Sequence, residues 1–436
     1  MNKLGIRKWI SFILAGFVGQ LAWALENNYL TLFVKDCTGT CSYIPIMTAA
    51  SAAAATLTTL FIGALCDRLG KRKSIISFGY ILWGISIILF AIFSPYSSFS
   101  IVGSSIAFSG SMIVVMDCIM TFFGSSANDA AFNAYVTDKT DTTNRGKVES
   151  VLSVLPLIAL VICLGLNMIL PGKKDGSGNA ITTANWDLFF LILGGITIIS
   201  GIACIFLLPK DEIKPNKEEP YIKNIVYGFR PSVIKSNKML YIALIAFMIF
   251  NIGVQVFLPY YMVYIQNLLG DNWLIALAIV LVLAISVTIV FGLFMDKIGK
   301  NKILIPALGV TILGCILMTV FKTPNIPLII LGATLLMIGY LVGTAVLGAK
   351  IRDYTPEAET GLFQGIRMFF VVLIPMCSGP FIGLGVSGAT FQQYFDLDNP
   401  VNPNNFIFLG AAVVLLFAVL PLIYIIVKEK KHETVR

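Results

Sequence analysis

The segment Gly63–Ser74 reads GALCDRLGKRKS and places five charged residues in a chain that is otherwise strongly apolar. A close copy, GLFMDKIGKNKI, occupies Gly292–Ile303. The two copies align without gaps, and glycine, aspartate and lysine recur at matching positions. The matched pairs are Gly63 with Gly292, Asp67 with Asp296, Gly70 with Gly299, Lys71 with Lys300 and Lys73 with Lys302. This repetition predicts that one structural unit is used twice.

The composition predicts a helical membrane protein. Of the 436 residues, 57% are hydrophobic and only 12% are charged, which is about half the charged share of a soluble domain. The mean hydropathy is +0.87. Too few polar residues are present to cover a soluble fold of this size. Long apolar runs, in place of short alternating segments, also exclude a membrane barrel. The net charge of +8 does not indicate nucleic acid, because its distribution follows the membrane loops.

Twelve apolar runs are long enough to cross the hydrocarbon, which takes about 20 residues in a helix. Helices are required because lipid offers no partner to free backbone groups. The predicted spans are 9–34, 43–65, 74–94, 105–136, 148–170, 185–208, 239–265, 272–295, 303–321, 326–349, 362–386 and 405–427. The fourth run is nearly long enough for two crossings, but a second crossing would invert every later loop. Gly124, Ser125 and Ser126 in its middle predict a kink or a break.

Basic residues in the loops predict the orientation. With the N-terminus inside, the outer loops hold four of the 31 lysines and arginines: Lys35, Lys173, Lys174 and Lys322. Both termini are therefore expected in the cytoplasm, and the chain is expected to be a multi-pass protein of the plasma membrane.

The longest polar stretch predicts the boundary between two halves. Residues 209–238 are read as a cytoplasmic linker between an N-terminal half, 1–208, and a C-terminal half, 239–436. Within it, 221–229 is expected either to form a short amphipathic helix or to be part of a mobile tether. A second repeated pair, DKTDTTNRGKVES from Asp138 and DYTPEAETGLFQG from Asp353, follows the fourth span of each half.

Few residues are suited to a cofactor or to catalysis. The one histidine is His432 in the tail, and the eight cysteines lie mostly inside apolar runs, so no metal, cofactor or enzyme activity is expected. Cys37 and Cys41 are expected either to stay free or to form a disulfide on an oxidising side. No phosphate-binding loop of the form G-x-x-x-x-G-K-[ST] is present.

The repeated segment resembles the loop signature of the major facilitator superfamily. The resemblance implies twelve helices in two six-helix halves and alternating access around a central path. It also implies a latch in which Asp67 and Asp296, with Arg68 and Lys297 beside them, hold the inner face shut. The alternative is that these charges anchor the loops to lipid headgroups, which is the role expected for Lys71, Arg72 and Lys73.

Three further stretches indicate a branch of that family. GQLAWALENNYLTLF, from Gly19, resembles the first helix of sucrose–proton symporters. ANDAAFNAYVTD and LFQGIRMFFVVLIPMCSGPFIG resemble glycoside–cation symporters. The resemblance implies uptake of a small polar solute, such as a sugar, with a cation. Sodium-coupled members carry acids on the second helix, whereas 48–65 here has none, which favours a proton.

Polar residues in the first span form the first candidate site. A charge near the bilayer centre costs about 2.5–3.5 kcal/mol unless it is paired, neutralised or hydrated. Gln20, Trp23 and Glu26 share roughly one helical face, with Asn27 beside them. Carboxylates and amides bind hydroxyl groups, and an aromatic ring stacks on a pyranose, so this face is expected to bind substrate. The alternative is a buried Glu26 that serves packing.

The fourth span contributes Asn128, Asp129 and Asn133 as further substrate ligands. By the resemblance, Asp129 is the first choice for cation coupling, with Glu26 as the second acid. The alternative for Asp129 is a structural carboxylate that caps the broken helix. Asp117 lies 12 residues earlier, about 18 Å along the helix, and is expected to be a relay or a vestibule charge.

The second half offers Asn251 and Gln255 at i and i+4 of the seventh span, followed by tyrosines. They are expected either to bind substrate or to make an ordinary helix contact. Arg367, near the inner end of span eleven, is expected to snorkel to the interface and is also a gating candidate. The remaining gating candidates are Asp138, Arg145 and Asp353, each at the inner surface.

These residues predict a proton-coupled symporter for a small polar solute such as a sugar or glycoside, acting as a monomer. The competing hypothesis is a proton-coupled exporter of amphipathic compounds, which the 31 phenylalanines and 14 methionines also suit. A membrane receptor on the same scaffold is the third, although the short tails leave no room for a signalling domain.

Overall fold

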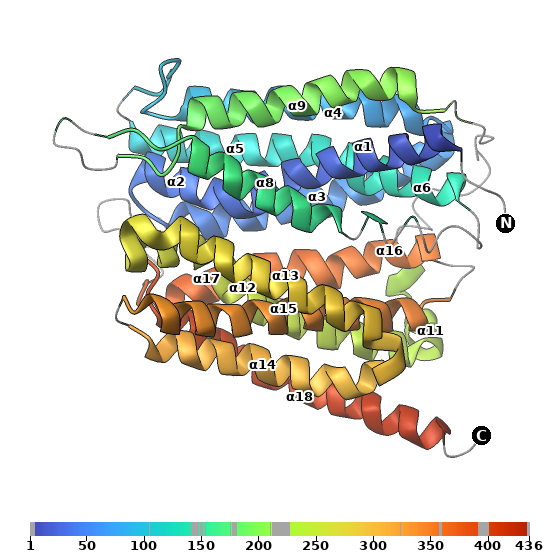
Figure 1. Ribbon diagram of the computed structural model, residues 1–436. Coiled ribbons are helices and arrows are strands. Elements are labelled where there is room, and N and C mark those ends of the chain that lie inside the picture. The colour runs from blue at the N-terminus through green and yellow to red at the C-terminus, as the bar shows by residue number, and fades with distance from the viewer. Residues whose placement is uncertain are drawn as a thin grey trace. The chain divides into compact units, whose positions relative to one another are not determined.

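The computed structural model describes residues 5–103, 105–140, 148, 151–152, 154–174, 176, 181–209, 211, 227–322, 324–356, 360–390 and 401–433. The chain forms two compact units, Met1–Tyr221 and Ile222–Arg436. Figure 1 shows that each is a bundle of long helices.

Six spans make up the first unit. The first, α1 (Ile6–Ala24), η1 (Leu25–Tyr29) and α2 (Leu30–Thr38), is one continuous helix with a π-helical turn inside it. The others are α3 (Tyr43–Leu69); α4 (Arg72–Leu89) with η2 (Phe90–Phe93); α5 (Ile106–Gly124) with η3 (Ser125–Phe132) and α6 (Asn133–Lys139); α8 (Leu155–Ile169); and α9 (Trp186–Leu207).

The second unit begins with two short elements, η4 (Tyr227–Phe229) and α11 (Pro231–Ser236). Its spans are α12 (Lys238–Leu269), which η5 (Gly270–Asn272) joins to α13 (Trp273–Ile298); α14 (Lys300–Val320); α15 (Ile326–Tyr354); α16 (Thr360–Met368) with η7 (Phe369–Leu373) and α17 (Ile374–Val386); and α18 (Phe406–Glu433).

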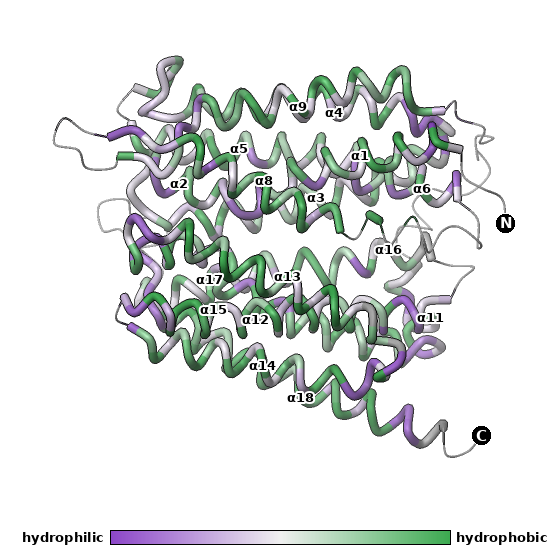
Figure 2. The backbone as a smooth tube through the Cα atoms, in the orientation of Figure 1, coloured by the Kyte–Doolittle hydropathy of each residue, from purple (hydrophilic) through white to green (hydrophobic). Residues whose placement is uncertain are grey.

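The described helices confirm the predicted membrane fold. Ten stretches are long and apolar enough to cross a membrane; one of them, Lys238–Gly292, holds both α12 and α13, and Leu155–Ile169 is a shorter apolar helix. Together they account for the twelve predicted spans. Figure 2 shows hydrophobic residues along the lengths of the helices and hydrophilic residues gathered mainly at their ends.

The helices pair in the same way inside each unit. In the first unit, α1 contacts α8 and α9, α3 contacts α5, and α4 contacts α5 and α9. In the second unit, α12 contacts α17 and α18, α13 contacts α15, and α14 contacts α15 and α18. When the spans of each unit are numbered one to six, the same pairs are in contact in both units. Span one contacts spans five and six, span two contacts span four, and span three contacts spans four and six. This common pattern agrees with the repeat in the sequence.

The fourth span crosses once, and its predicted irregularity is a π-helical segment. Ile106–Lys139 is helical throughout, and the wide turns begin at Ser125, directly after Gly124. Gly124 packs against the indole of Trp83, where a Cβ atom would come within 2.6 Å of the ring. Wide turns of this kind often occur at functional sites, and among the described residues they recur at η1 and η7.

Cys37 and Cys41 are both buried, free thiols. Burial raises the pKa of the Cys41 thiol to about 12, so this thiol stays protonated and poorly nucleophilic at neutral pH. The predicted linker lies largely outside the described residues, and α11 is the helix found near its end.

Two neighbouring glycines of α9 test the packing of the first unit. Gly194 lies against the backbone of Gly84 in α4, where a Cβ would stand 2.6 Å from the carbonyl oxygen, whereas a Cβ at Gly195 meets open space. We expect Gly194→Val to destabilise the unit by roughly 1–3 kcal/mol through overpacking and Gly195→Val to have little effect. Thermal unfolding of the two purified variants checks this, and equal melting temperatures would contradict it.

Candidate functional site

Polar groups of the first and fourth spans meet at Glu26. The Thr121 hydroxyl of α5 donates a hydrogen bond of 2.8 Å to Oε1 of Glu26 in η1. Glu26 is only 7% exposed. Its other oxygen, Oε2, has no hydrogen-bond partner among the described residues. The substrate and coupling candidate of the first span is therefore joined directly to the fourth span.

Asp117 belongs to the same group of side chains. It lies four residues before Thr121, which is one helical turn of α5, and it is 1% exposed. The Ser51 hydroxyl of α3, which donates to the carbonyl oxygen of Thr48, lies near its carboxyl group, whereas Oδ1 has no partner among the described residues. Glu26 lies within electrostatic range of Asp117 and, more weakly, of Asp129. The expectation of a vestibule charge is wrong, because Asp117 is buried.

Asp129 has a separate environment in η3. Its Oδ2 accepts a hydrogen bond from the Ser125 hydroxyl at 3.1 Å, and its Oδ1 accepts one from the Asn128 amide at 3.4 Å. The Tyr80 hydroxyl of α4 lies 3.2 Å from Oδ1 of Asn128 and 2.6 Å from the carbonyl oxygen of Ala15. Asp129 is partly exposed, so it is more accessible than Glu26 or Asp117.

Aromatic rings surround this second group. The rings of Trp23 and Trp83 meet edge to face at 5.1 Å, and Tyr80 lies 5.9 Å from Trp83. Trp23 is partly exposed, as is Gln20 one turn before it. Gly19 allows α1 to approach Asn128 closely, because a Cβ there would collide with the amide. Amide, carboxylate and aromatic groups thus lie near one another.

Two other predicted ligands bond to their own helix. The amide of Asn27 donates to the carbonyl oxygen of Trp23, and that of Asn133 donates to the carbonyl oxygen of Asp129. Both side chains are exposed on the unit, so each still has an amide oxygen to offer a solute.

The sequence reasoning missed Thr121 and Ser125. Both lie on the same helical face as the acids, since successive members of the series Asp117, Thr121, Ser125 and Asp129 are four residues apart. Side chains at this spacing lie next to one another on a helix. The spacing is visible in the sequence, and it was overlooked because hydroxyl residues are common in apolar helices.

In the second unit, one of the two predicted amide ligands already bonds to a neighbouring helix. The Asn251 side chain of α12 donates a 2.9 Å hydrogen bond to the carbonyl oxygen of Val371 in η7, which is the helix contact that the sequence left as an alternative. Gln255 is partly exposed, and its backbone packs against Gly379. Tyr261 is buried, and its hydroxyl has no partner among the described residues.

The structure describes the side chains of some of the predicted gating residues. Asp138 forms an ion pair with Arg72 at 3.2 Å. Arg72 is 4% exposed, so the expectation that it anchors the loop to headgroups is wrong. Arg68, Lys297 and Arg367 are exposed on their units. The side chains of Asp67 and Asp296 and the whole of Arg145 lie outside the described residues.

A matching charged cluster lies in the second unit. Asp353 pairs with Lys300 at 2.7 Å. Glu429 of α18 accepts hydrogen bonds from Lys350, Asn301 and the hydroxyl of Tyr354. In the first unit, Asp211 likewise accepts from the backbone N–H of Lys73. In each unit, a carboxylate near the end of the sixth span or just after it thus reaches the start of the third.

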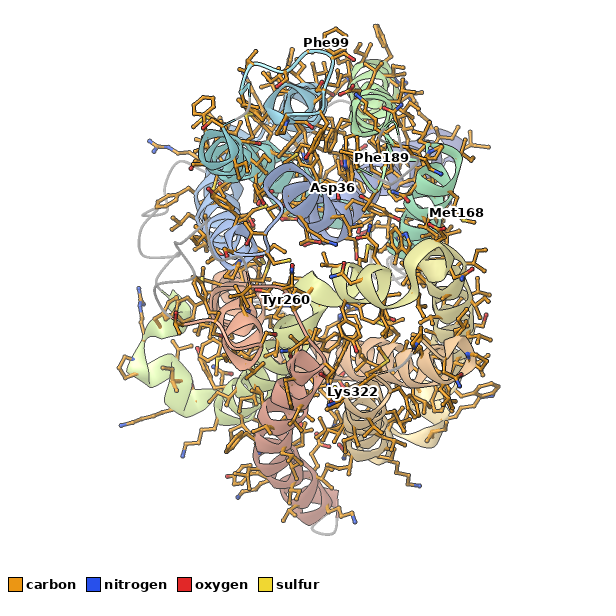
Figure 3. All side chains as sticks on the ribbon, turned by 90° about the vertical axis from the view of Figure 1, so that its left-hand side faces the viewer. Asp36, Phe99, Met168, Phe189, Tyr260 and Lys322 are labelled. Carbon is orange, nitrogen blue, oxygen red and sulfur yellow. The ribbon has the colours of Figure 1, made fainter. Side chains whose placement is uncertain are left out.

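At the other end of the first unit, the carboxylate of Asp36 links the first span to the start of the sixth by hydrogen bonds. Oδ2 of Asp36 in α2 accepts hydrogen bonds from the backbone N–H and hydroxyl of Thr183 and from the indole N–H of Trp186. Figure 3 shows Asp36 inside this end of the bundle, near the helix that carries Phe189. Asp36 therefore has a structural role and is not a further member of the acid group.

The chain belongs to the Major Facilitator Superfamily, whose family model matches residues 12–340 and 288–436. It is 22% identical to an uncharacterized transporter of Buchnera aphidicola subsp. Schizaphis graminum (strain Sg), over 86% of this chain and 83% of the relative. Its fold is similar to a D-xylose–proton symporter (TM-score 0.71, 15% identity, 95% and 97% of the two chains). It is also similar to the nucleoside transporter NupG (TM-score 0.66, 13% identity, 97% and 99%). The protein is thus a transporter that works by alternating access, and it is not an enzyme.

The Glu429 cluster gives a test of how the second unit is held together. Lys350 is 5% exposed, and Glu429→Ala leaves its ammonium group buried without a carboxylate. We expect a loss of about 3–5 kcal/mol and a lower melting temperature. Lys428→Ala, an exposed neighbour, is the matched control and should melt like the wild type. An unchanged melting temperature for Glu429→Ala would refute the role of the cluster.

Proposed function

We propose that the protein is a proton-coupled symporter for a small, uncharged, polar solute of the sugar or glycoside type. The observation that carries the proposal is the group of three acids in the first and fourth spans. Glu26, Asp117 and Asp129 form no ion pair with a basic side chain in the described part of the first unit. A carboxylate in such a position must be neutralised by a cation or reached by water.

The choice of a proton rests on the second span. Between Tyr43 and Cys66, α3 carries no acid, so a cation site built from the second and fourth spans lacks half of its ligands. A single proton needs only one carboxylate, whereas a metal cation needs several oxygen ligands held around it. The acids of the first and fourth spans suffice for a proton.

The choice of solute rests on the groups around Asp129. Carboxylate, amide and indole groups at Asp129, Asn128 and Trp23 suit hydroxyl groups and the flat face of a sugar ring. Two proteins of similar fold are a D-xylose–proton symporter and a nucleoside transporter, and both of these solutes carry sugar hydroxyls. The branch of glycoside–cation and sucrose–proton symporters, which the sequence resembles, agrees with this choice.

The remaining parts of the proposal concern the arrangement in the cell. We place both termini in the cytoplasm and the protein in the plasma membrane as a monomer, with halves 1–208 and 239–436 and a linker between them. Asp67 and Asp296 act as latch residues at the inner face, with the ion pairs of Asp138 and Asp353 beside them. The basic residues of the loops support this orientation.

Uptake of protons with the solute tests the proposal. In proteoliposomes, one sugar of a panel should acidify the lumen as it enters. Asp129→Asn should reduce uptake driven by a pH gradient at least tenfold, because it removes a carboxylate from the solute site. Asp271→Asn, an exposed acid between α12 and α13, is the control and should transport normally. Normal transport by Asp129→Asn, or proton-driven extrusion of amphipathic compounds in place of sugar uptake, would contradict the proposal.

A further inference from the structure

The three acids of the first unit do not form one equivalent set. Glu26 is bonded to Thr121, which is one turn, or about 6 Å, from Asp117 along α5. Asp129 lies eight residues beyond Thr121, about 12 Å along the same span. Burial also distinguishes the first two acids from the third, because Glu26 and Asp117 are 7% and 1% exposed whereas Asp129 is partly exposed. Glu26 and Asp117 therefore make a pair from which Asp129 stands apart.

Each member of the pair retains an unused, buried oxygen atom. Oε2 of Glu26 and Oδ1 of Asp117 have no hydrogen-bond partner among the described residues. A buried carboxylate oxygen without a partner costs free energy, and two adjacent negative charges without a basic partner cost more. Both costs are removed if the pair holds one proton and carries one charge.

We propose that Glu26 and Asp117 form a carboxyl pair that binds a single exchangeable proton as one unit, with Thr121 as the positioning residue that orients Glu26. This inference rests on the proposed function and deepens it, because it assigns the proton to this pair and leaves Asp129 to the solute. No covalent step is involved: the proton moves onto a carboxylate oxygen of the pair and leaves from it.

The surroundings of the pair supply hydroxyl groups and no positive charge. Thr121 donates a hydrogen bond to Glu26, and the hydroxyl of Ser51 lies near Asp117. The described titratable groups that interact with the pair are Asp129 of η3 and Cys118 of α5. Tyr29 of η1, Tyr80 of α4 and Cys163 of α8 also lie on the elements packed around it, whereas the basic residues of these elements, such as Lys35, Arg68 and Arg72, lie at the helix ends. None of the groups that interact with the pair is basic, so a proton is the positive charge available to it within the described part of the first unit.

The test is a titration followed by infrared absorption of protonated carboxyl groups in the purified protein, which requires no transport. In the wild type we expect a carboxyl band that appears and disappears with pH. Glu26→Gln and Asp117→Asn should each move the midpoint of the remaining carboxyl by about one pH unit or more, since coupled groups titrate as a pair. Thr121→Val should also move the midpoint, and Thr121→Ser should restore it.

Three outcomes would overturn the pair. In the first, each single variant removes one band and leaves the other midpoint unchanged. In the second, sodium at constant pH abolishes the band. In the third, Asp129→Asn moves the midpoint as far as Asp117→Asn does. Glu26→Gln and Asp117→Asn each remove one partner of the same pair, so either variant alone tests the coupling if the other does not fold. Asp271→Asn is the control and should leave every band in place.

Transport measurements separate this inference from the proposed function. If the wild type takes up no solute with protons while the infrared titration shows a coupled pair, the proposed function fails and the pair stands. If the wild type is a proton symporter and Glu26→Gln still accumulates solute against its gradient, the pair fails and the proposed function stands.

Discussion

The hydrogen bond from Thr121 to Glu26 is the contact on which the account of this transporter depends. It joins the first span to the fourth inside an apolar bundle, where a carboxylate costs about 2.5–3.5 kcal/mol and one hydrogen bond to a charged group returns only about 1.5–3 kcal/mol. The remaining cost has to be met by a proton, an ion or water. This cost supports the proposed binding role of Glu26, which lies in the π-helical turn η1 beside the fourth span.

Much of the fold was predictable because lipid restricts the possible structures. The twelve spans follow from apolar length, the repeat follows from Gly63–Ser74 and its copy, and the irregular turn after Gly124 follows from three small residues in one run. The detailed chemistry was less predictable. Asp117 was expected far from the other acids, because distance along one helix gives no information about which residues a neighbouring helix brings alongside. Only the packing of η1 on α5 places Glu26 near it.

The charged clusters at the helix ends illustrate the same limit. Sequence alone indicated Asp138 and Asp353 as gating residues, but their ion-pair partners Arg72 and Lys300 were not identified. Glu429 was not singled out in the sequence, yet it accepts hydrogen bonds from two other helices. A charged residue near a chain end is usually exposed, so only the approach of α18 to α14 and α15 shows its role. Both units use a carboxylate at or just after the end of the sixth span.

The central claim is that proton movement through Glu26 is tied to movement of an uncharged solute. Because such a solute carries no charge, each transport cycle must move positive charge into the vesicle. The most direct test is the current recorded when solute is added to protein reconstituted on a supported membrane in sodium-free buffer. The account predicts a sustained inward current for the wild type and none beyond the binding transient for Glu26→Gln. An equal sustained current in both would contradict it.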